Sequence, residues 1–251
     1  ERYLMRHIED LARTASSRGI ARYSGFLSDR EQQLAQAALN RTDMPEDEIR
    51  FDGGWPGAER KLLCLEPVDS YPASPLCCVR LQCRALPGAQ LPVHKDYLGS
   101  LMGLELRREA LGDIVLPEDQ PGVAYVFALE PAAELICQEL RQAGHTDLTA
   151  EMQPLETLPA FPQAERPRQT ATVSSLRLDA VLAAMLRCSR GMAAELVTAG
   201  RVEINHLPAE SVHAPVYEDD VFTVRGKGRF QLTALPGKSK KDRLIIEYFQ
   251  Y

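Results

Sequence analysis

The sequence predicts an α+β protein built from three parts. Helical and strand patterns are mixed throughout the 251 residues, residues 75–154 alternate them in a regular order, and residues 174–251 open with two short helices before further strands. Four prolines between residues 154 and 167 remove amide donors and disfavour helix, so residues 155–173 are predicted to form a semi-rigid linker. We therefore expect an N-terminal α/β domain (1–74), a central domain and a C-terminal domain.

The N-terminal part reads as two helices followed by two strands. Apolar spacing predicts a helix over Leu4–Ala15, and Ser28 with Glu31 three residues later forms a capping box that opens a second helix ending near Asn40. The strands are predicted at Ile49–Asp52 and Lys61–Leu65. The glycine-rich loop between them lacks the GK[ST] signature of a phosphate-binding loop, so an ordinary turn is the better interpretation.

The central part follows the order β-α-β-β-α-β. Strands are predicted at Leu76–Arg84, Asp113–Leu116, Val123–Ala128 and Asp147–Gln153, with helices at His94–Arg108 and Pro131–Ala143. This order is the ferredoxin-like arrangement, which RNA-recognition motifs also use. Such sheets stack bases on exposed aromatics of the first and third strands. Here the first strand has no aromatic and Val123 occupies the position that would partner Tyr125, so we expect no base stacking on this sheet.

The composition indicates a soluble globular protein whose charge is unevenly spread. No apolar run approaches the roughly 20 residues that span a bilayer, and the first residues do not resemble a signal peptide. The six cysteines show no CxxC pair and no zinc spacing, so we expect reduced thiols, no metal, no cofactor and a cytoplasmic location. Residues 174–251 hold 11 Lys and Arg against 9 Asp and Glu, whereas the rest of the chain holds 18 against 26. A mildly basic C-terminal part on an acidic body indicates a local nucleic-acid footprint.

The C-terminal part begins with two short helices and a strand. Apolar residues recur at helical spacing from Leu178, and Ser189 stands where it could cap the second helix. Gly200 is placed to end that helix in the left-handed conformation. Arg201–Ile204 alternates as a strand and Asn205 begins a turn. Four arginines fall outside this packing pattern, namely Arg177, Arg187, Arg190 and Arg201.

These motifs resemble the S4 domain, a small RNA-binding module. The resemblance rests on Arg-Leu-Asp from Arg177, Ser-Arg from Ser189, Gly-Arg-Val from Gly200 with Asn205 three residues later, and residues 220–230. Two departures remove possible phosphate contacts and imply weaker affinity. Met192 stands where many S4 domains carry lysine, and His206 stands where glycine or lysine is usual.

Three segments extend the resemblance over almost the whole chain. Residues 93–114, 23–28 and 53–60 are similar to the YlmH family of bacterial RNA-binding proteins. That resemblance implies an N-terminal α/β region, a central RNA-recognition-like domain, a C-terminal S4 domain and a non-enzymatic role at the ribosome. Related S4 proteins bind large ribosomal subunits that hold stranded peptidyl-tRNA. We therefore expect a monomer that binds structured rRNA or tRNA on the large subunit, in rescue of stalled translation.

The candidate RNA-binding residues lie in the C-terminal part. Cationic side chains would contact phosphates, Ser189 would cap the second helix and present its amides, and Asn205 would hold the turn or contact a 2′-hydroxyl. Asp179 is expected either to be an N-terminal helix residue or to orient a nearby arginine, rather than to contact RNA. The set is Arg177, Arg187, Ser189, Arg190, Arg201, Asn205, Lys227 and Arg229. Auxiliary contacts are expected from His94 and Lys95 at a helix start, and from Lys238, Lys240 and Lys241 at a hairpin tip between strands Phe230–Leu235 and Leu244–Phe249.

Two other functions remain as alternatives. RNA-modifying enzymes such as pseudouridine synthases append S4 domains and carry an Arg-Leu-Asp whose catalytic Asp precedes Thr or Ser and Gly. Here Asp179 precedes Ala-Val-Leu and no second Arg-Leu-Asp occurs upstream. The second alternative is a protein–protein adaptor that uses the acidic body, since the family name is linked to a cell-division gene neighbourhood.

Overall fold

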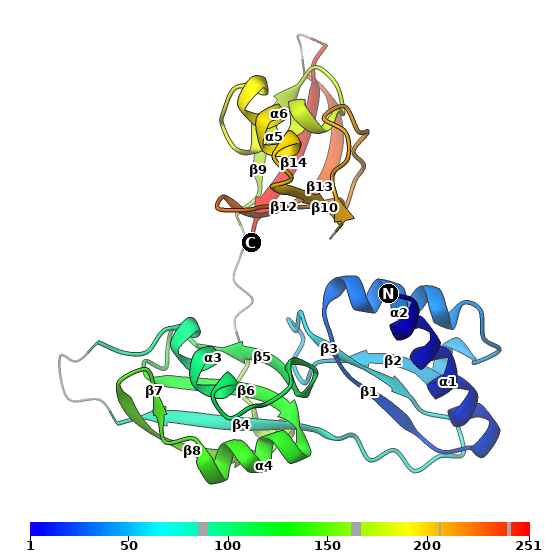
Figure 1. Cartoon of the computed structure of the whole chain (residues 1–251), viewed down its shortest axis with the longest axis vertical. Coiled ribbons are helices and arrows are strands. Elements are labelled where there is room, and N and C mark those ends of the chain that lie inside the picture. Colours follow the sequence, from blue (N-terminus) through cyan, green and yellow to red (C-terminus); the bar gives the residue numbers. More distant parts are fainter. Residues whose placement is uncertain (85–89, 162–166, 206, 240–241) are drawn as a thin grey trace. The chain divides into compact units, whose positions relative to one another are not determined.

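The computed structural model describes residues 1–84, 90–161, 167–205, 207–239 and 242–251. It divides into two compact units, Glu1–Gln163 and Ala164–Tyr251 (Figure 1). Mixed helices and strands in both units confirm the α+β class. Among the described residues, no helix has the length and apolar character that crossing a membrane requires.

The N-terminal part of the first unit is a three-stranded antiparallel sheet covered by two helices. The helices are α1 (Arg2–Arg18) and α2 (Asp29–Leu39), and the strands lie in the order β1 (Arg22–Leu27), β3 (Lys61–Leu65), β2 (Ile49–Asp52). The capping box is confirmed, because Glu31 Oε2 accepts from the Ser28 backbone amide at 2.8 Å. Strand β1 was not predicted. It contains a bulge in which the buried Ser24 hydroxyl accepts from Leu63 N at 2.9 Å.

The central part has the predicted ferredoxin-like topology. Its sheet lies in the order β5-β6-β4-β8-β7, which returns the last main strand to the side of the first. Helices α3 and α4 pack on one face of it (Figure 1). The elements are β4 (Leu76–Cys83), α3 (His94–Met102), β5 (Leu111–Val115), β6 (Val123–Leu129), α4 (Glu130–Glu139), β7 (Gln142–Ala143) and β8 (Thr146–Gln153).

Both central helices are shorter than predicted, for local reasons. Helix α3 ends at Met102 rather than Arg108, because Gly103 follows and Glu105 adopts a left-handed φ of 57°. Helix α4 ends at Glu139 rather than Ala143, because Gln142–Ala143 pairs with β8 instead. A local backbone turn therefore ends α3, and strand pairing ends α4.

The two sheets of the first unit share a core, and this core covers the face that RNA-recognition motifs use. Phe26 from β1 packs with Tyr125 and Phe127 from β6, which are 4% and 0% exposed. Phe161, beyond β8, places its ring 5.0 Å from that of Tyr125 and 5.6 Å from that of Trp55. The chain's own side chains thus occupy the places where bases would stack.

Glycines allow this close approach of the two sheets. A Cβ at Gly112 would lie 2.5 Å from Phe26 Cε1, and one at Gly54 would lie 2.5 Å from Phe127 Cδ1. Gly54 also has a φ of 85°, which favours glycine. Either position therefore resists a larger residue.

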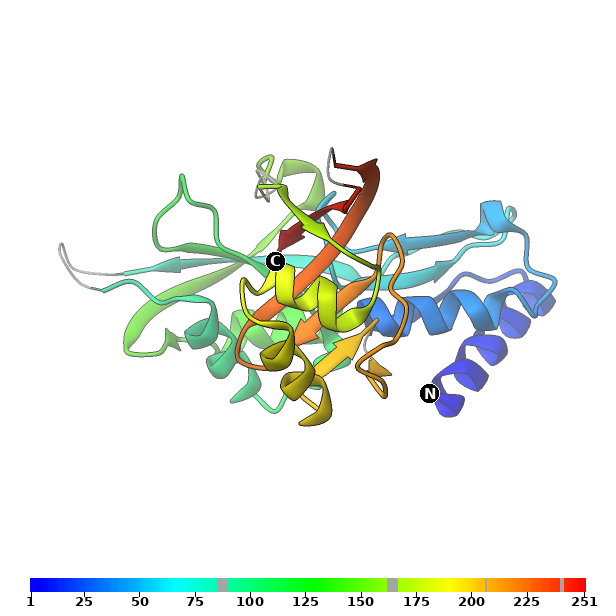
Figure 2. The ribbon, with the colours of Figure 1, turned by 90° about the horizontal axis from the view of Figure 1, so that it is seen from above.

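The second unit is a six-stranded antiparallel sheet packed against α5 (Leu178–Met185) and α6 (Arg190–Thr198), as Figures 1 and 2 show. The strand order is β11-β10-β12-β13-β14-β9. Phe222 and Leu232 are fully buried between helices and sheet. The strands are β9 (Gln169–Val173), β10 (Val202–Ile204), β11 (Leu207–Pro208), β12 (Val221–Val224), β13 (Gly228–Lys238) and β14 (Leu244–Gln250).

The predicted linker, residues 155–173, is wrong at its C-terminal end. Gln169–Val173 forms β9 and pairs with β14, with Gln169 opposite Tyr248 and Val173 opposite Leu244. The strand completes the sheet edge, and Val173 is buried in the core. Gln169–Val173 therefore belongs to the C-terminal unit.

Candidate nucleic-acid interface

The turn between α5 and α6 presents two of the predicted arginines. Ser189 caps α6 as predicted, because its Oγ accepts from Met192 N at 3.2 Å. Arg187 occupies the position after α5 where glycine is usual, with a φ of 51°. The amide of Cys188 donates to Ala183 O at 3.0 Å and fixes this helix end. The Arg187 side chain is exposed.

Asp179 lies in the first turn of α5 and orients two arginines, so the structure shows both of the roles considered for it. The residue is 5% exposed, and its carboxylate accepts from Arg177 Nε at 3.2 Å and from Arg190 Nη2 at 2.6 Å. Arg177 also contacts His213 Nδ1. Burial alone would raise the pKa of Asp179, but the bonds from Arg190 and Arg177 outweigh it and lower the pKa below its usual value. The carboxylate stays charged and keeps both guanidinium groups oriented.

Replacing Asp179 with asparagine should lower the free energy of unfolding of the C-terminal unit by about 1–3 kcal/mol at neutral pH. Two charge-assisted bonds are lost, and the partial exposure of both arginines limits the effect. Because folding lowers this pKa, the contribution is present above the ordinary carboxyl pKa of about 3.9 and is lost as the pH falls through the folded value. Urea unfolding of wild type and Asp179→Asn at pH 7 and pH 3 measures this. An equal difference at both pH values would contradict it.

Lys227 lies in the turn between β12 and β13, and Arg201, directly before β10, reaches this turn with its side chain. Arg201 Nη2 donates to Arg225 O at 2.8 Å, and the Arg225 amide donates back to Arg201 O at 2.9 Å. Lys227 is exposed in the same turn. We call Arg177, Arg187, Arg190, Arg201 and Lys227 the basic surface.

Asn205 holds a turn, which is one of its two predicted roles. Its backbone is left-handed with a φ of 49°. Its Nδ2 donates to Asp220 Oδ1 at 2.8 Å, and its Oδ1 accepts from Val221 N at 2.9 Å. Both ends of the amide are thereby engaged within the protein, so contact with a 2′-hydroxyl is not favoured.

The remaining predicted cations are engaged with other side chains or lie elsewhere. Arg229 is half-buried, with its guanidinium carbon 4.4 Å from the centroid of the Tyr251 ring. Lys238 Nζ pairs with Asp242 Oδ1 at 2.7 Å. Lys240 and Lys241 lie outside the described residues.

His94 and Lys95 belong to the first unit, at the exposed first turn of α3. Asp96 closes that helix start, because its Oδ2 accepts from Val93 N at 2.9 Å. The predicted helix start is therefore confirmed. Contact of these two side chains with RNA stays a prediction.

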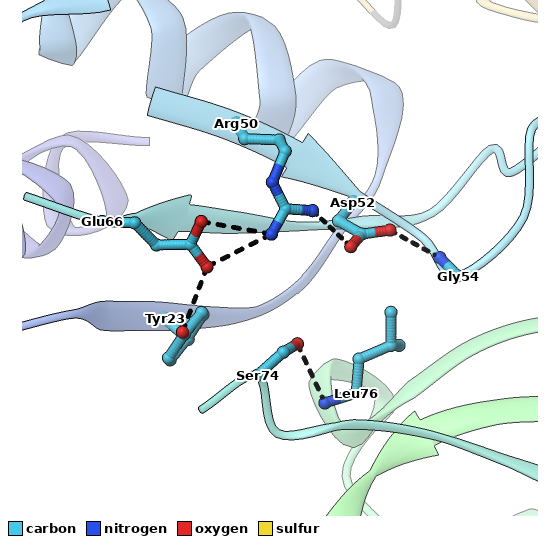
Figure 3. Close-up of polar contacts among 7 residues, drawn as sticks. All are labelled: Tyr23, Arg50, Asp52, Gly54, Glu66, Ser74 and Leu76. Carbon is cyan, nitrogen blue, oxygen red and sulfur yellow. Dashed lines mark hydrogen bonds and ion pairs between the residues drawn. The ribbon is translucent and has the colours of Figure 1, made fainter. Parts of the chain in front are cut away.

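A separate charged cluster on the N-terminal sheet is paired internally (Figure 3). Arg50 forms ion pairs with Asp52 and with Glu66, the latter at 3.1 Å. The Tyr23 hydroxyl donates to Glu66 at 3.1 Å, and burial together with this bond raises the pKa of Tyr23 to about 12. Two carboxylates thus balance the charge of Arg50, and this cluster offers little net attraction to phosphate.

Comparison with known proteins finds the S4 domain over residues 176–222. The "Ribosome-associated protein quality control protein P2" of Bacillus subtilis (strain 168) is 35% identical over 226 residues, which cover 89% of this chain and 84% of that protein. The chain belongs to the YlmH family. A solved structure, "Cell division protein ylmH from Streptococcus pneumoniae", is similar with a TM-score of 0.49 and 13% identity, covering 63% of this chain and 94% of that chain.

The segments that carry the two resemblances have different roles in the structure. Those that resemble the YlmH family lie in the first unit, and those that resemble the S4 domain lie in the second. Those of the first unit join its two sheets: Asp113 accepts from Trp55 Nε1 at 3.3 Å and from the Glu59 amide at 2.8 Å, while Arg60 Nη2 donates to Phe26 O at 2.9 Å. Those of the S4 domain build the basic surface. Contacts between the two sheets explain the presence of Trp55, Arg60 and Asp113 in the first unit. Packing does not explain the exposed cations of the basic surface.

Two side chains around the basic surface, those of His213 and Gln169, were not predicted from the sequence. His213 reaches Arg177 from a loop, and Gln169 Oε1 accepts from Arg187 Nη2 at 3.2 Å. Neither lies near its partner in sequence. Only the fold brings them together, and no local pattern could have indicated them.

Proposed function

We propose that this protein binds structured RNA through the basic surface of its S4 domain. It acts without catalysis on rRNA or tRNA at the large ribosomal subunit in the cytoplasm, in rescue of stalled translation. The observation that carries the proposal is the set of exposed cations on the α5–α6 turn and the β12–β13 turn, in a chain whose remainder is acidic. The name of the Bacillus subtilis relative supports a ribosomal site of action.

The geometry suits phosphate contacts better than base reading. Arginines presented at helix ends and turns can follow a backbone, whereas paired RNA exposes little readable base edge. Asp179 presets the directions of Arg177 and Arg190, which reduces the side-chain entropy lost on binding.

The position of Asp179 also separates this proposal from an RNA-modifying enzyme. In the pseudouridine synthase alternative, the Asp of an Arg-Leu-Asp motif must reach the substrate. Here that carboxylate is buried and bonded by two arginines. Incubation with RNA followed by nucleoside mass spectrometry should detect no modified nucleoside, and a modified nucleoside would overturn the non-catalytic part.

Binding to RNA should depend steeply on salt. About five phosphate contacts, one for each cation of the basic surface, at roughly 0.7–0.9 per contact, give a slope of log affinity against log salt of about −3.5 to −4.5. Fluorescence anisotropy with a labelled RNA stem over a salt series measures it. A slope shallower than about −2 would contradict binding by the basic surface.

Co-sedimentation tests the ribosomal target. Purified large and small subunits are each centrifuged through sucrose with the protein at two salt concentrations. We expect the protein to travel with the large subunit and to be released by the higher salt. Equal recovery with both subunits would contradict the choice of subunit, and no recovery with either would contradict the ribosomal site of action.

A further inference from the structure

A pocket of about 350 Å³ opens beside the basic surface in the C-terminal unit. It lies where the start of β9, the end of α5, the β12–β13 turn and the end of β14 meet. A volume near the lower end of the roughly 300–1,000 Å³ range of small-molecule sites suits a group about the size of one nucleotide. Its lining includes Gln169, Met185, Arg187, Lys227, Phe230 and Gln250.

Two amides in the pocket are fixed in opposite orientations. The Arg187 guanidinium can only donate, so it turns Gln169 Oε1 toward itself, and Tyr248 Oη donates to the same oxygen at 3.3 Å. The Lys227 carbonyl can only accept, so it turns Gln250 Nε2 toward itself at 3.2 Å. Gln169 Nε2 is left to donate and Gln250 Oε1 to accept. One donor and one acceptor complement the Watson–Crick edge of a nucleobase.

The other walls suit a base and its phosphate. Met185 and Phe230 are each 4% exposed and supply a small apolar part of the pocket wall. Arg187 and Lys227 bring two exposed positive charges to the same pocket. Arg187 keeps a left-handed backbone that glycine would adopt at lower cost, and such strain in a non-glycine residue is typical of ligand sites.

We propose that this pocket takes one unpaired nucleotide of the bound RNA, with its base between the two amides and its phosphate at Arg187 and Lys227. The inference rests on the proposed function and adds a local specificity to it, since a base in a paired stem cannot enter a pocket. The preferred RNA therefore carries a bulged or looped-out nucleotide beside a stem. Every nucleobase carries at least one donor and one acceptor on its Watson–Crick edge, so each of the four could bond both amides. We therefore expect weak discrimination among the four bases.

The test compares three RNA hairpins that share one stem: fully paired, with one bulged uridine, and with an abasic site at the bulge. Fluorescence anisotropy at fixed salt should show the uridine bulge binding about ten-fold tighter than the abasic bulge, because the abasic bulge lacks the two hydrogen bonds to the amides. The variant Gln250→Met keeps the side-chain length but loses the acceptor. It should lose this preference and keep its affinity for the paired stem. Gln33→Met, at an exposed position of α2 in the other unit, is the matched control and should behave as wild type.

The outcomes separate the pocket from the basic surface. If no hairpin binds the wild-type protein, the proposal that this domain binds RNA is overturned, and so is the proposal that an RNA nucleotide occupies the pocket. If the three hairpins bind equally, or Gln250→Met keeps the uridine preference, the pocket proposal alone is overturned. Free uridine 5′-monophosphate tests whether the pocket binds a free nucleotide rather than a nucleotide of an RNA chain. Displacement of the bulged hairpin at micromolar concentration would overturn an RNA nucleotide in favour of a free one.

Discussion

Reversing the charge of Arg187 and Arg190 together should abolish RNA binding at moderate salt, with a loss of about 100-fold or more. Two phosphate contacts become two repulsions at the turn that joins α5 and α6. The loss of two contacts should also make the salt slope shallower by about 2. Anisotropy with an RNA stem and co-sedimentation with the large subunit, each for wild type and Arg187→Glu/Arg190→Glu, measure the effect.

Two further variants make this result specific. Arg6→Glu/Arg13→Glu changes the net charge equally on exposed positions of α1 and should leave RNA binding nearly unchanged. The neutral pair Arg187→Gln/Arg190→Gln should give a smaller loss of affinity, about ten-fold. Because this pair also removes the bond from Arg190 to Asp179, it shows how much of the loss comes from that bond and how much from charge repulsion. Wild-type affinity in the charge-reversed variant would move the RNA contact to another part of the chain.

Thermal unfolding should show two transitions, and Phe127→Ala should lower only one of them. Phe127 is fully buried where the N-terminal and central sheets share a core, so its truncation destabilises Glu1–Gln163 as a whole. The expected loss is about 3–5 kcal/mol, or roughly 6–20 °C for a unit of this size. Differential scanning calorimetry measures both transitions.

Phe222→Ala is the matched truncation in the other unit. Phe222 is fully buried between the helices and sheet of Ala164–Tyr251, so this variant should lower the second transition and spare the first. Separate transitions for the N-terminal and central parts in Phe127→Ala would contradict their shared core. A single transition in wild type would contradict two independently folding units.

Local sequence patterns were enough to predict most helices and strands and to identify the exposed arginines. Ile49–Asp52, Lys61–Leu65, the capping box at Ser28 and the Ser189 cap depend on neighbours a few residues away, and the structure has all four. The arginines were identified because they fall outside the helical packing pattern, and in the structure Arg187, Arg190 and Arg201 are exposed.

Long-range pairing was what the sequence could not show. Strand β9 depends on β14, some seventy residues later, and β1 contains a bulge around a buried serine that breaks alternation. The ring of Tyr251 against Arg229, and Asp220 against Asn205, likewise join distant positions. Such partners decide which polar side chains remain available to bind a ligand. The sequence could therefore locate the candidate site, but it could not tell which of its residues are already bonded within the protein.

The pairing of the first and last strands of the C-terminal unit has a practical consequence. Gln169 and Gln250 both line the pocket, and the Tyr251 ring lies against Arg229. A purification tag fused after Tyr251 would therefore emerge beside the pocket and Lys227, where an acidic or bulky peptide would compete with RNA. A tag placed before Glu1 joins the other compact unit. Affinity measurements on this protein should carry the tag at that end.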